Sequence, residues 1–452
     1  MKTQPTPPPM PDCDPQPPPP LAGAPTHPRI FIGLAETAGY YHGLWQGLRS
    51  HGVRCSYACL TEHPFGYGCD EQVPYVQAIR AARRARQQPG FLGLRRLAAS
   101  TREKLLRWRL LRWAARHHDV FIFGYKSTFF KSFGDLAWLR RRGKRVVCIF
   151  MGSDSRPPYM DGSCLRQEHN VSPAECISLT RRQQQELATI EAHSDLIVAN
   201  PYSAQLHRRE FLSFFALGFP VIGSGNPVAG TPPDSGRAMR ILHCPSHPES
   251  KGTERIRAAI AQLRAKGLAL DYTEIINQPN RVVQDALRQC DLVVDQVFSD
   301  TPMAGLAAEA AGWGKPAVVG SYAAELFARE IPREFRPPSE VCHPDRIAEA
   351  IQTLVVDHEY RIKLGHRARE FVTTVWNHQA VAQRMIEVLT TECPEAWKCD
   401  PKKTTYLHGY GMSEARVRQQ VAALLKLGGT SSLQLQDKPQ LESLMVQFAA
   451  GS

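Results

Sequence analysis

The stretch from Asp291 to Val319, DLVVDQVFSDTPMAGLAAEAAGWGKPAVV, most constrains the fold of this chain. A hydrophobic run ends there in a polar loop, a helix of small residues follows, and Gly-Lys-Pro precedes a second β-branched run. This order predicts a strand, a loop, a helix and a second strand parallel to the first. The loop would lie at the carboxyl end of the first strand, where open α/β sheets bind ligands.

The same alternation of strands and helices fills both sides of a Gly/Pro-rich stretch at residues 223–236, which we interpret as a linker. Such alternation is typical of mostly parallel sheets with helices on both faces. We therefore predict an α/β protein with two Rossmann-like, doubly wound domains. Strands are expected at residues 29–35, 53–59, 119–125 and 144–154 before the linker, and at 240–244, 270–276, 291–296 and 316–320 after it.

Two charged side chains of the second half suit a ligand site. Glu309 lies on a predicted helix whose neighbouring positions are apolar, so its carboxylate needs a polar partner, and a ligand hydroxyl is one candidate. Lys251 and Gly252, in HCPSHPESKGTERI, precede a helix that Thr253 opens. A cation next to a helix amino terminus favours bound phosphate.

These residues resemble the carboxyl-terminal domain of GT-B glycosyltransferases, in particular the group 1 (family 4) set. The resemblance covers roughly Arg29 to Thr391 and is specific only in the carboxyl-terminal half. It implies two domains facing a cleft. The implied divisions are a disordered Pro-rich tail at 1–28, an acceptor-side domain at 29–222, a linker at 223–236, a nucleotide-sugar-binding domain at 237–375, a crossover helix at 376–392 and an extension at 393–452 with a helix at 413–427.

The resemblance also implies a donor site. Lys251, Gly252 and Thr253 would hold the diphosphate and Glu309 the ribose of a nucleotide-sugar, which is the donor substrate, and no metal or cofactor is required. The chain departs from the family pattern at Ser246, where an Arg is usual, at Thr301, where a Glu is usual, and at Met151, where some members have His. The remaining donor-binding candidates form the sugar loop: Asp300, Thr301, Met303, Ala304 and Gly305.

The acceptor side is predicted from the first half. FMGSDSR matches a family sequence at Gly152, Ser153, Asp154 and Arg156, and Asp154 joins Lys251 as a catalytic candidate, although an Asp that only caps the next turn is nearly as plausible. Gly39 and Tyr40 are further acceptor-side candidates. Gly39, Gly43 and Gly47 recur every four residues, so one stripe of the predicted helix carries no side chains. This stripe allows close approach either of a packing neighbour or of the cleft.

A strongly basic segment runs from Ile79 to Arg116, with twelve Arg or Lys residues against the single acid Glu103. We expect its second half to form a helix that docks on the anionic cytoplasmic face of the inner membrane. A solvated basic face is the alternative, and no nucleic acid is expected, since no aromatic-and-basic nucleic-acid module accompanies the charge. The candidate membrane residues are Arg107, Trp108, Arg109, Arg112 and Trp113.

Composition bears on whether the protein spans a membrane, is secreted or contains disulfides. The chain has 452 residues, 43% of them hydrophobic, yet no uninterrupted apolar run of about 18 residues that would span a bilayer. The first 28 residues contain 12 of the 35 prolines and lack the apolar core of a signal peptide. Twelve scattered cysteines favour reduced thiols in the cytoplasm, with a Cys164–Cys176 disulfide as a weaker alternative.

The predicted function is transfer of a sugar from a nucleotide-sugar to a glycan or lipid-linked acceptor in cell-surface polysaccharide or lipopolysaccharide synthesis. As the resemblance implies, the enzyme would be a metal-independent, retaining transferase of the hexosyltransferase type. The departures at Ser246, Thr301 and Met151 keep two alternatives open: a non-catalytic GT-B-like binding protein, and a nucleotide-sugar epimerase.

Overall fold

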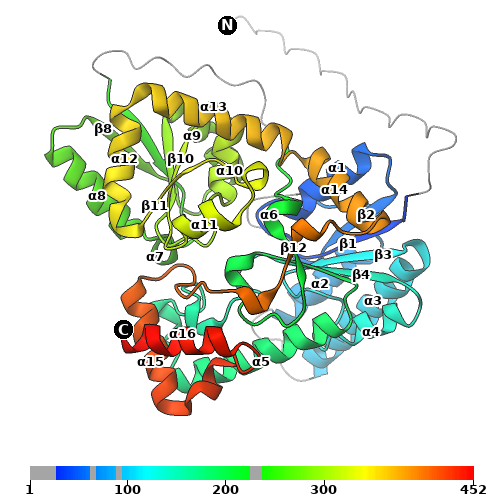
Figure 1. The fold of residues 1–452 in the computed structure, drawn as a ribbon. Helices are drawn as coiled ribbons and strands as arrows, with labels where there is room; N and C mark the ends of the chain where they lie inside the picture. The colour runs from blue at the N-terminus through cyan, green and yellow to red at the C-terminus, as the bar shows by residue number, and fades with distance from the viewer. Residues whose placement is uncertain (1–26, 62–67, 88–93, 224–236, 452) are drawn as a thin grey trace, which may run out of the picture.

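The computed structural model describes residues 27–61, 68–87, 94–223 and 237–451 (Figure 1). The predicted Pro-rich tail and nearly all of the predicted linker lie outside these residues. The described chain forms two α/β units, each built on its own sheet. Figure 1 shows the two units side by side, with the last helices, α15 and α16, beneath them.

The first sheet has the order β12-β6-β5-β4-β3-β1-β2, and only β12 is antiparallel to its neighbour. The strands β1 to β5 are almost entirely buried because helices cover both faces. Their bounds are β1 Ile30–Leu34, β2 Cys55–Cys59, β3 Val120–Gly124, β4 Arg145–Phe150, β5 Leu196–Ala199, β6 Phe211–Ser213 and β12 Lys398–Cys399. The helices are α1 Tyr40–Ser50, α2 Val76–Gln87, α3 Leu94–His117, α4 Gly134–Arg140, α5 Pro173–Ala192 and α6 Phe214–Leu217.

The second sheet is wholly parallel and has the order β11-β10-β9-β7-β8. Its strands are β7 Met239–His243, β8 Leu270–Glu274, β9 Leu292–Gln296, β10 Ala317–Gly320 and β11 Glu340–Cys342. Its helices are α7 Pro248–Lys251, α8 Thr253–Ala265, α9 Asn280–Gln289, α10 Gly305–Gly312, α11 Ala324–Glu330, α12 Ile347–Val356 and α13 His358–Thr374.

Both sheets are doubly wound, because the chain runs from the first strand to one side and then reverses to the other. The reversal falls between β1 and β3 in the first sheet and between β7 and β9 in the second. Such switch points open a crevice at the carboxyl ends of the strands. Two doubly wound domains around one interdomain region are the GT-B fold class predicted from the sequence.

Helix α14, His378–Thr390, returns from the second domain and packs against α1 (Figure 1). The glycine stripe of α1 makes this contact possible. A Cβ atom at Gly47 would lie 2.0 Å from the carbonyl oxygen of His378, and one at Gly43 would lie 2.2 Å from that of Pro220. The stripe therefore serves packing at these two glycines. Asn377 is the amino cap of α14.

The carboxyl-terminal residues belong to the first domain as much as to the second. Strand β12 extends the first sheet, and α15, Glu414–Gly428, packs on α5 and on α16, Pro439–Ala450. Val417, Val421 and Leu424 of α15 are buried in the core of the first domain. The helix expected at residues 413–427 is present, with Ser413 as its amino cap.

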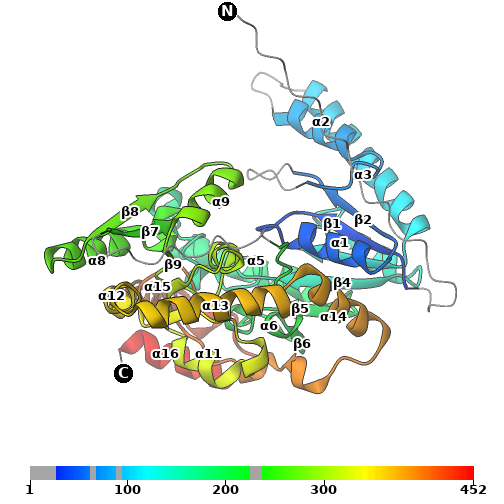
Figure 2. The same cartoon turned by 90° about the horizontal axis from the view of Figure 1, so that it is seen from above.

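The basic segment forms a helical hairpin of α2 and α3 that projects at the edge of the first domain (Figure 2). The predicted membrane face is only partly free. Trp108 packs against Trp138 and Phe130, and Trp113 stacks on His117, because both rings cover the apolar core. Arg107 is paired with Glu103 at 3.0 Å. Of the five candidates, the exposed ones are Arg109 and Arg112.

None of the helices in the described part of the chain is long and apolar enough to cross a membrane. Cys164 and Cys176 are both free thiols, so the alternative of a disulfide between them was wrong. Burial raises the pKa of the Cys176 thiol to about 12 and that of Cys164 to about 11, which keeps both protonated at neutral pH.

Candidate functional site

A cavity of about 180 Å³ opens at the switch point of the second sheet. Its walls come from the loops that follow β7 and β8, from the end of β9 and from one face of α10, so it occupies the crevice at the carboxyl ends of the strands. We call it the donor cavity. It is lined by Ala38, Cys244, Pro245, Ser246, Lys251, Ile275, Asn277, Gln278, Asn280, Val283, Asp295, Gly305, Leu306 and Glu309.

Glu309 lies on the exposed side of α10, whose opposite side is a run of buried alanines. Its carboxylate accepts a hydrogen bond from the Asn280 amide at 3.0 Å and faces the donor cavity. Carboxylate oxygens can accept hydrogen bonds from ligand hydroxyls. Glu309 and Asn280 are 29 positions apart in the sequence, and both line this cavity.

Lys251 ends α7 and enters the same cavity. Gly252 after it has a φ of 73°, and a Cβ there would lie 2.7 Å from the Val297 side chain, so only glycine fits this turn. The Lys251 ammonium donates to the Gln296 amide oxygen. Burial opposes its charge, but Tyr410 and Asp295 beside it outweigh burial and raise the pKa of Lys251. The ammonium is therefore charged at neutral pH.

Thr253 and Ser246 have different surroundings. Thr253 is buried, and its hydroxyl pairs with the His243 ring at 2.9 Å, so it fixes the start of α8. Ser246 is exposed and lines the cavity. Burial lowers the pKa of His243 to about 4, so this ring is neutral and adds no charge for a phosphate.

Asp295 is a further carboxylate of this cavity, at the end of β9. Burial raises its pKa, while the nearby Lys251 and backbone N–H groups act in the opposite direction. One of its carboxyl oxygens is buried without a hydrogen-bond partner. Perturbed and incompletely satisfied carboxyls are concentrated at functional sites. The sequence pattern offered only its position at the end of a strand as a signal.

The predicted sugar loop is held by the other domain. The Asp300 carboxylate pairs with Arg156, which also lies 3.3 Å from Asp161, and all three are buried. The Asn200 side chain donates to the Asp300 carbonyl at 3.1 Å. Burial disfavours the Arg156 charge, but the two carboxylates outweigh burial and raise its pKa. Arg156 was predicted on the acceptor side. In the structure its buried guanidinium joins the two domains through the pair with Asp300.

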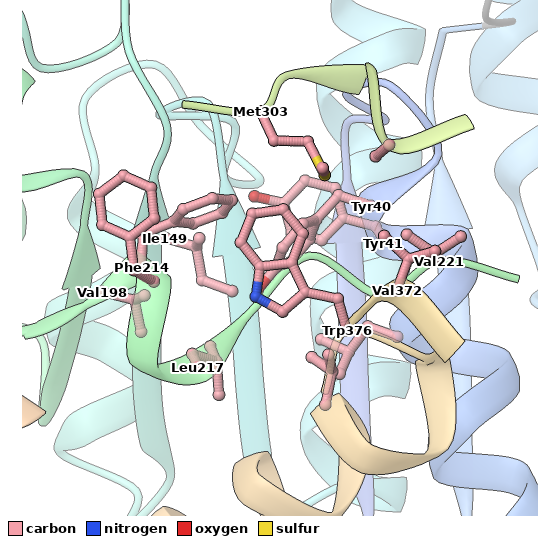
Figure 3. Close-up of a cluster of buried hydrophobic side chains, with 14 of the residues drawn as sticks. Tyr40, Tyr41, Ile149, Val198, Phe214, Leu217, Val221, Met303, Val372 and Trp376 are labelled. Carbon is pink, nitrogen blue, oxygen red and sulfur yellow. The ribbon is translucent and has the colours of Figure 1, made fainter. Parts of the chain in front are cut away.

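Met303 projects into a buried apolar cluster that contains residues of both domains, near Tyr40, Tyr41 and Trp376 (Figure 3). Its side chain is buried, and a contact between this loop and a donor sugar stays a prediction. Thr301 turns inward as well, and its hydroxyl bonds the Met303 carbonyl at 3.1 Å. Of the predicted loop, Gly305 lines the donor cavity, and Ala304 caps α10 beside it.

A second cavity, of about 360 Å³, adjoins the donor cavity and shares Glu309 and Ala38 with it. We call it the acceptor cavity. Gly39 lines it, as does His42, whose ring bonds the Gly68 carbonyl at 3.0 Å. Tyr40 does not reach it, because its ring is fully buried against Tyr41 and Phe214. An acceptor contact by Tyr40 stays a prediction.

Asp154 is buried and caps its own loop. One carboxyl oxygen accepts from the backbone N–H groups of Met151 and Gly152 at 3.1 and 2.9 Å, and the other is buried without a partner. Burial raises its pKa. The loop-capping alternative is thus present in the structure, and Gly152 takes part in it through its backbone. A direct acceptor contact by Asp154 stays a prediction.

Sequence reasoning missed the contribution of the carboxyl-terminal extension. Tyr410 lies with its ring over Arg156 and over Lys251, 4.9 and 5.6 Å from the ring centroid. No local pattern marks it, apart from the flanking Gly409 and Gly411, both with φ of 69°. Among the described residues, no group of three His, Cys, Asp or Glu side chains is arranged to hold a metal ion.

The chain is similar to several solved structures. Anabaena HepE in complex with UDP-glucose has 13% identity and a TM-score of 0.47, over 80% of this chain and all of that one. The glycosyltransferase SnogD from Streptomyces nogalater has 14% identity and a TM-score of 0.40, over 80% and 99%. The spinosyn rhamnosyltransferase SpnG complexed with thymidine diphosphate has 15% identity and a TM-score of 0.42, over 79% and 100%.

No protein-family model and no curated protein sequence matches the chain. Because the TM-scores of these three structures are below 0.5, the fold class rests on the strand order and the switch points described above.

Proposed function

We propose that the protein is a glycosyltransferase that uses a nucleotide-sugar donor. The observation that carries this proposal is the joint placement of Lys251 and Glu309 in one cavity at the switch point of a parallel sheet. A cation and a carboxylate, separated by a partly apolar wall, match the diphosphate and the ribose of a nucleotide. Ile275 and Val283 give the cavity an apolar surface for a base.

The proposed chemistry uses the charge of Lys251. When the glycosidic bond breaks, negative charge grows on the diphosphate leaving group, and a fixed ammonium stabilises that charge without reorganisation. Gln296 and the glycine turn at Gly252 hold the ammonium in place. Asp295 lies beside it, and one of its carboxyl oxygens is buried without a hydrogen-bond partner. In this scheme a metal ion is not needed.

The acceptor cavity adjoins the donor cavity at Glu309, so an acceptor hydroxyl placed near Gly39 and His42 would face the donor sugar. We propose a glycan or lipid-linked acceptor of cell-surface polysaccharide or lipopolysaccharide synthesis and transfer with retention, as in the group 1 resemblance.

A non-catalytic binding protein is the second candidate. The observation in its favour is that Asp300 and Met303 of the sugar loop are taken up in contacts between the domains. Such a protein would bind a nucleotide or a glycan but would not turn over a nucleotide-sugar. Release of nucleoside diphosphate from the donor therefore separates the two candidates.

The first prediction concerns nucleotide binding. A panel of UDP, GDP, ADP, CDP and dTDP should contain one that stabilises the protein by about 2.7 kcal/mol at a concentration 100 times its Kd. Glu309→Gln should weaken that nucleotide at least about tenfold, because a charged acceptor of ribose hydroxyls is lost. Thermal unfolding and calorimetry measure both. Glu325→Gln, on the exposed part of α11, is the control. No shift with any nucleotide would overturn the proposal.

We also propose peripheral docking on anionic membranes through the α2–α3 hairpin. Arg109 and Arg112 are exposed on α3, and Leu97 and Leu105 of the same helix are 64% and 50% exposed. A helix that exposes both cations and apolar side chains suits the surface of an anionic bilayer. The leucines take the place that the sequence assigned to the two tryptophans.

The second prediction tests this docking. Arg109→Glu together with Arg112→Glu should lower binding to phosphatidylglycerol vesicles at least about tenfold, since each basic residue near such a surface contributes roughly 1 kcal/mol. Co-sedimentation at low and physiological salt measures it, with phosphatidylcholine vesicles for comparison. The same double change at Arg181 and Arg182, exposed on α5, should have a much smaller effect. Equal losses would argue for general charge attraction, and no wild-type binding would refute docking.

A further inference from the structure

A segment of the carboxyl-terminal extension, residues 404–413, runs between the two domains close to Lys251. We call it the strap. On the first domain, the Tyr410 N–H donates to the Met160 carbonyl at 3.0 Å, and the Gly162 N–H donates to the Tyr410 carbonyl at 2.8 Å. On the second domain, the Gly411 N–H donates to the Phe298 carbonyl at 2.9 Å. The strap is therefore bonded through its backbone to both domains.

The packing of the strap admits little change in its position. A Cβ at Gly409 would lie 2.0 Å from the Met160 carbonyl oxygen, and one at Gly162 would lie 2.2 Å from that of Gly411. Next to these glycines, His408 stacks on the Tyr322 ring with 4.5 Å between centroids. Backbone in contact with backbone leaves no space for relaxation. The side chain of Tyr410 is thus presented from a fixed support.

That side chain is directed at the lysine of the donor cavity. The Lys251 Nζ atom lies over the face of the Tyr410 ring, 5.6 Å from its centroid, and the same ammonium donates to the Gln296 amide oxygen. A cation in this position is attracted by the negative face of the ring. A flexible lysine loses up to about 2 kcal/mol of rotamer freedom when it is held in one position. Two fixed partners on the protein already restrict the lysine before a ligand binds, so ligand binding does not have to offset this loss.

We infer that Tyr410 is a positioning residue of the donor site: from the strap, its ring holds the Lys251 ammonium for the terminal phosphate of a nucleoside diphosphate. This inference rests on the proposed function. It makes the carboxyl-terminal extension part of the phosphate subsite, although the extension lies about 160 residues after Lys251 in the sequence. Tyr410 acts through Lys251, whereas the base and the ribose are bound elsewhere in the cavity.

The test compares a diphosphate with its monophosphate. The nucleotide is the one that the panel above selects, and calorimetry gives the Kd of both forms for wild type, Tyr410→Leu and Tyr410→Phe. Tyr410→Leu removes the ring that faces Lys251, and Tyr410→Phe is the matched control because it keeps that ring. Each protein is also made with Lys251→Ala, which completes a double-mutant cycle.

We expect Tyr410→Leu to weaken the diphosphate about fivefold, as for the loss of a cation–ring contact of about 1 kcal/mol, and to change monophosphate binding less than about twofold. Tyr410→Phe should leave the ratio of the two Kd values unchanged, and in the Lys251→Ala background Tyr410→Leu should cost nothing more. A structural role for the ring would lower both affinities together.

Three results would overturn the inference. The diphosphate affinity is unchanged in Tyr410→Leu, or it falls equally with and without Lys251, or it rises, which would mean that the ring competes with phosphate for the lysine. Failure of the wild type to bind any nucleotide would overturn the proposed function as well, so the two failures are distinguishable.

Discussion

Replacing Arg156 with methionine should lower the free energy of unfolding by about 3–5 kcal/mol, the usual cost of removing one partner from a buried ion pair. The guanidinium is 2% exposed and lies between the carboxylates of Asp161 and Asp300, which are buried with it. Without the cation, both carboxylates stay in an apolar surrounding. Since Asp161 and Asp300 come from different domains, the contact between the domains should weaken first.

Urea unfolding followed by tryptophan fluorescence measures the loss. Arg140→Met is the matched control, because Arg140 pairs with Asp195 at 3.1 Å but is 41% exposed, and an exposed pair contributes about 0–1 kcal/mol. Adding Asp161→Asn and Asp300→Asn to Arg156→Met should restore part of the stability, as neutral groups no longer need the cation. Equal losses for Arg156→Met and Arg140→Met would contradict the prediction.

The parts of the structure that the sequence predicted are those in which pattern and contact are local. The unit formed by β9, α10 and β10 follows from a buried strand, a small-residue helix and a glycine turn within 29 residues. Lys251 and Glu309 belong to different strand–helix pairs of the second domain, but each follows a buried strand. Since parallel strands end at one edge of a sheet, their common cavity was predictable.

Contacts between distant segments were beyond such patterns. Met303 follows β9 in the sequence, yet its side chain packs in an apolar cluster with Tyr40 and Tyr41 of the other domain (Figure 3). Arg156 matched a motif that placed it by the acceptor, whereas its charge is used against Asp300, 144 positions away. A motif fixes the backbone neighbourhood of a residue, while the partner of a long side chain depends on how the domains meet.

The hairpin of α2 and α3 shows a similar limit. The sequence predicted a helix in this basic segment, but charge alone did not say which face of the helix the core covers. Trp108 and Trp113 cover Trp138 and His118 of the first domain, and Leu97 and Leu105 are exposed instead. Large aromatic rings bury more apolar area than leucine, so the domain core takes them first.

The largest effect on the proposed reaction is expected from Lys251→Ala. Turnover of the donor should fall about 10²- to 10³-fold, the cost of removing one preorganised group from a developing negative charge. Gln296 and Tyr410 hold the ammonium near Asp295, and no other Lys or Arg is among the described residues that line the donor cavity. The measurement is release of nucleoside diphosphate from the nucleotide-sugar of the selected base, with water as acceptor.

Lys266→Ala, an exposed lysine at the end of α8, is the control and should keep full turnover. Monophosphate binding by Lys251→Ala should also stay near the wild-type value, since Glu309 and the apolar wall are untouched. That combination separates a lost charge from a misfolded cavity. If Lys251→Ala released diphosphate at the wild-type rate, the leaving group would be stabilised elsewhere, and the role proposed for Lys251 would be wrong.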